Sequence, residues 1–305
     1  MADLTTDLGK LILKNPVMTA SGTFGYGYEY SDFYSLSKLG AVVVKGISPY
    51  PVYGNPMPRH YELHSGMLNA IGLQNPGVEK FIKYPEYLPF LKKSNAVTIV
   101  NIWGKTIDEY RQVAERLNGV DGINALEINI SCPNIKEGGI AFGTDLKLAG
   151  EVVSEVRKAT NLPLITKLSP NVTQITDFAK AVVDAGSDMV SLINTLTGMA
   201  IDVDTRKPVL ANVIGGVSGP AIKPVALKLV YDVANSVDVP VIGMGGICTG
   251  EDAIEFLLAG ASAVAVGTAI FMDPFAPIKV ISEINDYLDK NAYSSVSEIV
   301  GRLEL

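Results

Sequence analysis

Eight short apolar runs recur along the chain, and several of the segments between them have the spacing of amphipathic helices. The runs are nearly continuous and rich in Val, Ile and Ala, which is typical of strands buried on both faces. They cover residues 16–20, 41–45, 97–102, 125–130, 164–168, 189–193, 241–244 and 263–266. Helices are predicted over residues 106–117, 145–159, 173–185, 221–235 and 251–259. Capping residues are expected at Thr106, Thr173 and Thr249, and helix-ending glycines at Gly119, Gly186 and Gly260.

The alternation of buried strands and helices predicts an α/β fold, a (β/α)₈ TIM barrel built from residues 1–305 as a single domain. An open doubly wound sheet is the alternative on pattern alone. Against it, the first run lacks the dinucleotide-binding motif G-x-G-x-x-G. Gly25 and Gly27 match the first two glycines, but position 30, where the third would stand, is Tyr. Residues 104–106 resemble the end of a P-loop, but position 99 is Ile where that motif needs glycine.

Two long connections interrupt the regular alternation. Residues 48–75 follow the second run and residues 195–220 follow the sixth, and both are rich in Gly or Pro with little periodicity. Loops of this length inside a compact domain are usually functional or disordered. In a barrel they would follow strands, so we expect long loops to cover the C-terminal face, where barrel active sites lie.

Composition narrows the class of protein. Hydrophobic residues make up 48% and charged residues 19%, which fits a folded globule with a large core. With 25 Lys and Arg against 32 Asp and Glu, the net charge is −7, which disfavours nucleic acid as a partner. Residues 256–272 carry no charge, but Gly260 and Gly267 interrupt them, so a helix end and a buried strand are expected instead of a membrane span. We therefore expect a cytoplasmic protein with no membrane association.

Polar residues end several of the apolar runs. An isolated Asn at such a position is often a cap or turn residue, and an isolated Lys often reaches the surface. Several of them at corresponding positions predict one shared polar site at the carboxyl ends of the strands. The residues are Ser21, Lys45, Asn101, Asn129, Lys167, Asn194 and Thr195.

The last two strands are followed by glycine-rich turns, Gly245-Gly246 and Gly267-Thr268. Glycines here allow backbone N–H groups to approach an anion, and barrels often bind phosphate with these two loops. Ordinary turn formation is the alternative, and the presence of both turns favours a phosphate site.

The chain has two cysteines, Cys132 and Cys248, too few for a disulfide framework or an iron–sulfur cluster. Cys132 follows a strand and lies between polar residues in the sequence NISCPN (129–134), which favours a thiol in a polar pocket that can act as a base. Cys248 is interpreted as a packing residue. His60 and His64 flank Glu62 as H-x-E-x-H, which is not the metalloprotease motif, and no metal site is expected.

These residues resemble the dihydroorotate dehydrogenase family, and within it the class 1B catalytic subunits of bacteria. The motifs are TASGTFG (19–25), VKGIS (44–48), NAIGLQNPG (69–77), NISCPN (129–134) and GMGGI (243–247). The resemblance extends to about residue 289. It implies an FMN-binding barrel that oxidises dihydroorotate to orotate in pyrimidine biosynthesis.

The resemblance also implies the site. FMN would be held by Ser21, Lys45, Gly46, Asn101, Asn129, Lys167, Ile193, Gly219, Gly245, Gly246, Gly267 and Thr268. Lys167 would place a positive charge near the N1–O2 edge of the flavin. Substrate would be held by Lys45, Asn69, Ala70, Ile71, Gly72, Leu73, Asn129, Asn134, Asn194 and Thr195. Cys132 would remove the C5 proton while hydride passes from C6 to flavin N5.

Cysteine as the base separates class 1 from the membrane-associated class 2, which uses serine. Residues 72–77 and 101–104 resemble class 1B, not the fumarate-using homodimers of class 1A. Class 1B implies a partner subunit with FAD and a 2Fe–2S cluster, NAD as final acceptor, and a heterotetramer of two catalytic and two electron-transfer chains around a homodimer. A class 1A enzyme or a non-catalytic, electron-relaying flavin barrel remains the alternative, and Cys132 beside three amides argues against the latter. A tRNA-modifying flavin reductase is disfavoured by the negative net charge.

Overall fold

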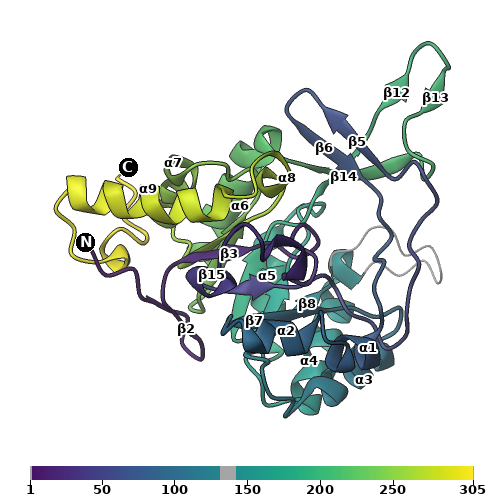
Figure 1. Cartoon of the computed structure of the whole chain (residues 1–305), viewed down its shortest axis with the longest axis horizontal. Coiled ribbons are helices and arrows are strands. Elements are labelled where there is room, and N and C mark those ends of the chain that lie inside the picture. The colour runs from purple at the N-terminus through teal and green to yellow at the C-terminus, as the bar shows by residue number, and fades with distance from the viewer. Residues whose placement is uncertain (1, 131–141, 305) are drawn as a thin grey trace.

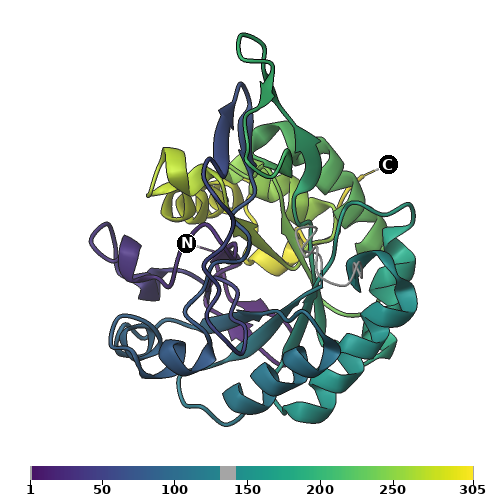
Figure 2. The ribbon, with the colours of Figure 1, turned by 90° about the vertical axis from the view of Figure 1, so that its right-hand side faces the viewer.

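The architecture is an eight-stranded parallel barrel. A computed structural model describes residues 2–130 and 142–304, and in these residues eight parallel strands form one sheet with helices around it (Figures 1 and 2). A parallel bridge between Met18 and Ala41 joins the two end strands and closes the barrel. In spatial order the strands are β3 (Val17–Thr19), β16 (Ala263–Val266), β15 (Val241–Met244), β10 (Met189–Leu192), β9 (Leu164–Lys167), β8 (Ala125–Asn129), β7 (Thr98–Ile102) and β4 (Val42–Val43). Each strand falls within one predicted run, so the barrel prediction is confirmed.

The predicted helices are present, with one capping prediction wrong. The hydroxyl oxygens of Thr106 and Thr249 accept backbone hydrogen bonds at the starts of α3 and α7. Thr173 does not cap α5, because that helix begins at Ile175 and its N-cap is Gln174. Helices α1, α2, α8 and α9 were not predicted. The helices are α1 (Val78–Lys83), α2 (Leu88–Lys93), α3 (Ile107–Leu117), α4 (Leu146–Ala159), α5 (Ile175–Asp184), α6 (Lys223–Ala234), α7 (Gly250–Leu258), α8 (Ala269–Met272) and α9 (Ala276–Lys290).

Two apolar cores stabilise the barrel. The larger core lies between the strands and the helices, where both sides contribute buried Val, Ile and Leu. The smaller core fills the barrel interior with residues such as Ala125, Met189 and Ala263, each the first residue of its strand. It also includes Leu8, Leu11 and Leu13 from the N-terminal hairpin of β1 (Thr6–Asp7) and β2 (Ile12–Leu13). The amino ends of the strands are thus packed with apolar side chains, which leaves the carboxyl ends for polar chemistry.

The two long connections form a second sheet that projects from the barrel as an arm (Figure 1). Its antiparallel order is β11 (Leu196–Met199), β14 (Ile214–Ser218), β6 (Gly66–Asn69) and β5 (His60–Leu63). A small hairpin of β12 (Ile201–Asp202) and β13 (Lys207–Pro208) extends it. The expectation of irregular loops is corrected here, because the two connections pair with each other as strands, with Gly216 opposite Asn69, 147 residues away in sequence.

In residues 2–130 and 142–304, no helix has the length and apolar character needed to cross a bilayer. The uncharged segment 256–272 contains the end of α7 and the strand β16, as predicted, and also the short helix α8, which was not predicted.

Candidate active site

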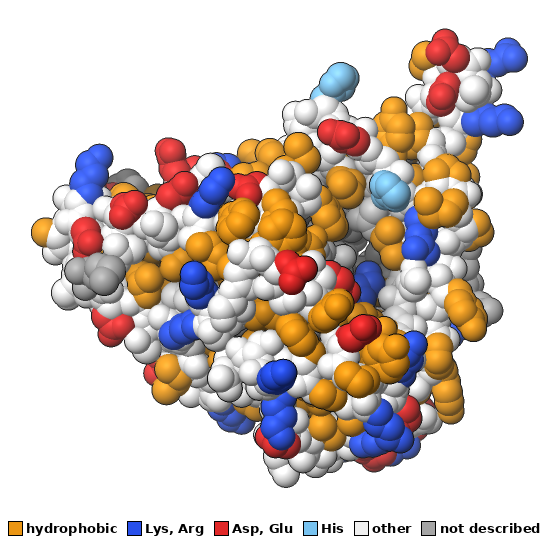
Figure 3. Space-filling view, viewed as in Figure 1, with side chains coloured by type: hydrophobic (Ala, Val, Ile, Leu, Met, Phe, Trp, Pro, Cys, Tyr) orange, Lys and Arg blue, Asp and Glu red, His pale blue; other side chains and the backbone are white. Residues whose placement is uncertain are grey.

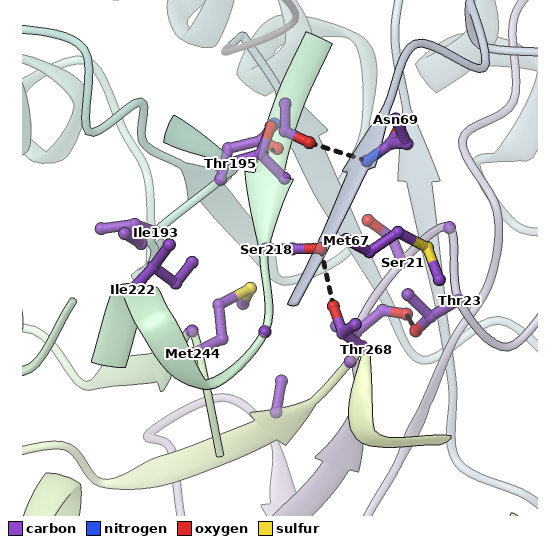
Figure 4. Close-up of a pocket in the computed structure, with 18 of the residues that line it drawn as sticks. Ser21, Thr23, Met67, Asn69, Ile193, Thr195, Ser218, Ile222, Met244 and Thr268 are labelled. Atoms are coloured by element: carbon purple, nitrogen blue, oxygen red, sulfur yellow. Dashed lines mark hydrogen bonds between the residues drawn. The ribbon is translucent and has the colours of Figure 1, made fainter. Parts of the chain in front are cut away.

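A cavity of about 520 Å³ opens at the carboxyl ends of the barrel strands. The surface is hollowed between the arm and the barrel (Figure 3), and residues from both line the space (Figure 4). Eighteen of the predicted residues line it: Ser21, Lys45, Gly46, Asn69, Ile71, Gly72, Leu73, Asn101, Asn129, Lys167, Ile193, Asn194, Thr195, Gly219, Gly245, Gly246, Gly267 and Thr268.

One predicted residue that the structure describes, Ala70, does not line the cavity. Ala70 is fully buried and packs with Leu68 and Leu210 in the arm, and its backbone N–H donates to the Arg59 carbonyl. Cys132 and Asn134 lie outside the described residues, so the prediction that Cys132 is the base stays a prediction.

Two lysine side chains bring positive charge to the cavity. Lys167 ends β9 and is only 5% exposed, and its Nζ lies 3.4 Å from the hydroxyl oxygen of Ser21. Lys45 follows β4, and Gly22 follows β3. The Nζ of Lys45 would be 3.4 Å from a Cβ atom built at Gly22, so the segments that follow β3 and β4 are in contact. Burial of an ammonium group is unfavourable without an anion or acceptors nearby. The cavity is therefore suited to a ligand with negative charge.

Amide side chains from the barrel and the arm converge on the same space. Asn194 Nδ2 lies 3.4 Å from Asn129 Oδ1, and Asn194 Oδ1 accepts from the Thr195 backbone at 2.8 Å. Asn69 reaches in from β6, with its Nδ2 3.4 Å from the Gly216 carbonyl (Figure 4). Each amide offers both donors and an acceptor. The group can therefore recognise a ring that carries carbonyl and N–H groups.

Glycines form a tight cradle at the other end of the cavity. Gly219, Gly245 and Gly246 have φ values of 100°, 129° and 79°, in the region that favours glycine. A Cβ atom on Gly246 would lie 2.9 Å from the backbone nitrogen of Lys223 and 3.0 Å from the carbonyl oxygen of Gly219. The close approach of the turn after β15 to the start of α6 therefore requires glycine at position 246. Beside them, Thr268 donates to Ser218 at 2.8 Å (Figure 4). Backbone-rich concavities of this kind bind phosphate groups.

A buried carboxylate beneath the cavity was missed by the sequence analysis. Glu127 lies in the interior of β8 and is 2% exposed. It accepts from Asn101 Nδ2 at 2.5 Å and from the Ser191 hydroxyl at 2.8 Å. A sequence-level clue existed, since a charged residue inside an otherwise apolar run requires a partner.

Cys248 also lines the cavity and is half-buried. Burial raises the pKa of its thiol, and the Asp252 carboxylate raises it further. Burial alone would raise the pKa of Asp252, but the Lys223 ammonium and the N–H groups of Cys248 and Thr249 lower it overall. The thiol of Cys248 is thus held in its protonated form.

Several other lining residues were not predicted as part of the site. Among them are His60 and Met67 of the arm, Ser218 at the end of β14, and Phe271 of α8. His60 lies in a strand, and the described residues contain no cluster of His, Cys, Asp and Glu with the arrangement of a metal site.

Comparison with known proteins agrees with this geometry. The family profile for dihydroorotate dehydrogenase matches residues 3–288. The dihydroorotate dehydrogenase B (NAD(+)) catalytic subunit of Geotalea uraniireducens is 56% identical over 301 residues, 99% of this chain and 98% of that protein. The protein of the same description from Alkaliphilus oremlandii is 58% identical over 291 residues, 95% of each.

A solved structure supports the fold. Dihydroorotate dehydrogenase of Eimeria tenella, crystallised with ferulenol, superposes with a TM-score of 0.83 at 24% identity and covers 98% of this chain and 88% of that one. The resemblance seen in the sequence motifs is therefore confirmed, and the chain belongs to the dihydroorotate dehydrogenase family.

Proposed function

We propose that the chain oxidises (S)-dihydroorotate to orotate as the catalytic subunit of an NAD-linked, class 1B dihydroorotate dehydrogenase. The observation that carries the proposal is one cavity that combines two lysines, a group of asparagine amides and a glycine cradle. The relatives described above as dihydroorotate dehydrogenase B (NAD(+)) catalytic subunits support the same class. Orotate is a carboxylate on a ring of amides, which this set of side chains matches.

Family membership implies a flavin, and we propose FMN, one per chain. The buried Oδ1 of Asn101 has no hydrogen-bond partner among the described residues, and a Cβ atom at Gly46 would lie 2.7 Å from it. An unpaired buried acceptor is unfavourable, so its partner is expected to be a ligand atom. Bound FMN supplies a hydride acceptor, N5, for the hydrogen that leaves C6 of dihydroorotate.

The residues divide between the two ends of the cavity. The glycine cradle of Gly219, Gly245, Gly246 and Gly267, with Thr268, would hold the phosphate of FMN. Lys167, Asn101 and Ser21 would lie along its ring. Lys45 would bind the substrate carboxylate, and the amides of Asn69, Asn129 and Asn194, with Thr195, would orient the substrate ring.

Cys132 would take the C5 proton of the substrate, and at neutral pH a thiolate is a much stronger base than a serine hydroxyl in the same position. Electrons would leave through a partner subunit that carries FAD and a 2Fe–2S cluster. The heterotetramer of two catalytic and two electron-transfer chains, around a homodimer of this chain, belongs to the same proposal.

The direct test is anaerobic mixing of the FMN-loaded chain with dihydroorotate, followed by flavin absorbance. The wild-type flavin should bleach, and Cys132→Ser should slow bleaching by about 10²–10⁴-fold, the usual contribution of a positioned base. Thr166→Val is the control, because Thr166 bonds to Ser187 at 2.8 Å on the helix side of β9, away from the cavity.

Each part of the proposal can be refuted by a specific result. Absence of bleaching in the wild-type chain would refute the dehydrogenase proposal, and normal bleaching in the Cys132 variant would refute its role as base. Efficient turnover with fumarate and without a partner would assign the chain to class 1A. Co-purification with an iron–sulfur flavoprotein is the result expected for class 1B.

A further inference from the structure

A row of three hydrogen-bonded side chains crosses the barrel interior directly under the cavity. Asn101 comes from β7, Glu127 from β8 and Ser191 from β10, and all three are at most 2% exposed. The Glu127 carboxylate lies between the other two, with one oxygen accepting from Asn101 and the other from Ser191. Next to them in the barrel the interior is apolar, with Ile99 and Ile165 among the side chains.

The carboxylate determines which way the Asn101 amide faces. A carboxylate only accepts hydrogen bonds, so the amide nitrogen of Asn101 is held against Glu127. Its oxygen, Oδ1, then has to lie on the other side, where Asn101 lines the cavity. Oδ1 lies so close to Gly46, another residue of the cavity lining, that a Cβ atom there would be only 2.7 Å away, so glycine is required beside the amide. The amide is therefore presented to a ligand as an acceptor.

A purely structural role accounts poorly for Glu127. Burial of a carboxylate in an apolar barrel is costly, and apolar residues of similar volume are often as stable or more stable at such positions. In this structure the buried carboxylate orients the Asn101 amide and accepts one further hydrogen bond, from Ser191. This arrangement is expected where the orientation matters to a bound ligand.

We propose that Glu127, itself held by Ser191, is a positioning residue for the cofactor. It fixes Asn101 so that Oδ1 accepts a hydrogen bond from an N–H group of the flavin ring. The inference rests on the proposed function, because it requires that FMN occupies the cavity. Glu127 does not touch the ligand in this scheme and acts only through Asn101.

The test measures the dissociation constant of FMN for the apoprotein by flavin fluorescence. Glu127→Leu removes the acceptor and frees the amide, and should weaken FMN binding about 2- to 12-fold, the net value of one hydrogen bond. Glu127→Gln keeps an oxygen for Asn101 and can donate its amide to the Ser191 oxygen, so it should restore binding to within about twofold of wild type. Thr166→Val again serves as the control, because it removes a buried hydrogen bond on the outer face of β9.

A double-mutant cycle asks whether Glu127 acts through Asn101. In an Asn101→Ala background, Glu127→Leu should cause no further loss of FMN affinity, because the amide that it orients is gone. Equal losses in both backgrounds would overturn the positioning role, as would wild-type affinity in Glu127→Leu. A loss in Glu127→Gln as large as in Glu127→Leu would also overturn it, since charge and not orientation would then decide binding. Failure of the wild-type chain to bind FMN would instead refute the proposed function on which the inference rests.

Discussion

Gly66 tests how the arm places Asn69 over the cavity. It begins β6, three residues before Asn69, and lies where the hairpin meets the end of β14. A Cβ atom built at Gly66 would lie 2.0 Å from the carbonyl oxygen of Ser218, which is backbone and cannot rotate away. Gly66→Ala must therefore displace β6 from β14 at the rim of the cavity.

The size of the effect follows from that contact. Real Cβ atoms essentially never approach closer than 3.0 Å, so one of the two strands has to move by about 1 Å. Forcing a methyl group into a packed site usually destabilises a protein by about 1–3 kcal/mol. Loss of one well-aligned hydrogen bond from Asn69 to the bound product would weaken binding by about 0.5–1.5 kcal/mol, which is about 2- to 12-fold.

The assay is titration of the FMN-loaded chain with orotate, followed by the change in flavin absorbance, with thermal melting measured in parallel. Gly66→Ala should weaken orotate binding and lower the melting temperature. Gly150→Ala is the matched control, because its Cβ would meet nothing closer than 3.8 Å in the interior of α4. That variant should bind orotate normally and gain about 0.5–1 kcal/mol of stability. Normal orotate affinity in a folded Gly66→Ala protein would refute the argument that the close approach of these strands sets the position of Asn69.

Three further predictions concern the barrel side of the site. Gly46→Ala should weaken FMN binding at least tenfold, since its methyl group would lie 2.7 Å from Asn101 Oδ1; unchanged FMN fluorescence quenching would contradict this. Asp252→Asn should lower the free energy of unfolding by about 1–2 kcal/mol at pH 7, because Asp252 completes the capping box of α7 with Thr249 and binds Lys223 at 2.6 Å. The pKa of Asp252 is lowered in the folded protein, so the stability that its carboxylate adds is present above the ordinary pKa of 3.8 and is lost as the pH falls below that value. Urea unfolding should therefore show a smaller difference in the free energy of unfolding between wild type and Asp252→Asn at pH 3 than at pH 7. Because the pKa of the Cys248 thiol is raised, iodoacetamide should alkylate Cys248 more slowly than it alkylates the free thiol glutathione at pH 7.5. Peptide mass spectrometry measures the rate of modification of Cys248.

The barrel was predictable because its signal is local. Strands buried on both faces need continuous apolar runs, and parallel strands need helices between them, so both features are written along the chain. Once a barrel is inferred, residues that end its strands, such as Lys45, Asn129 and Lys167, must gather at one face. The structure places these three on one cavity, as the sequence predicted. The capping error at Thr173 shows the limit of local reasoning, since helix starts shift by one or two residues with tertiary contacts.

The arm and the interior polar row depend on tertiary structure. The strands of the arm are short, rich in glycine and partly exposed, so neither apolar alternation nor length identifies them, and the pairing of β14 with β6, which joins the two connections, spans 147 residues from Asn69 to Gly216. The sequence alone determined the barrel, the polar strand ends and the two glycine turns, because each depends on neighbours in the chain. Tertiary structure alone decided that Asn69 faces the barrel and that Glu127 orients Asn101, because both depend on pairings between strands that the local pattern does not encode.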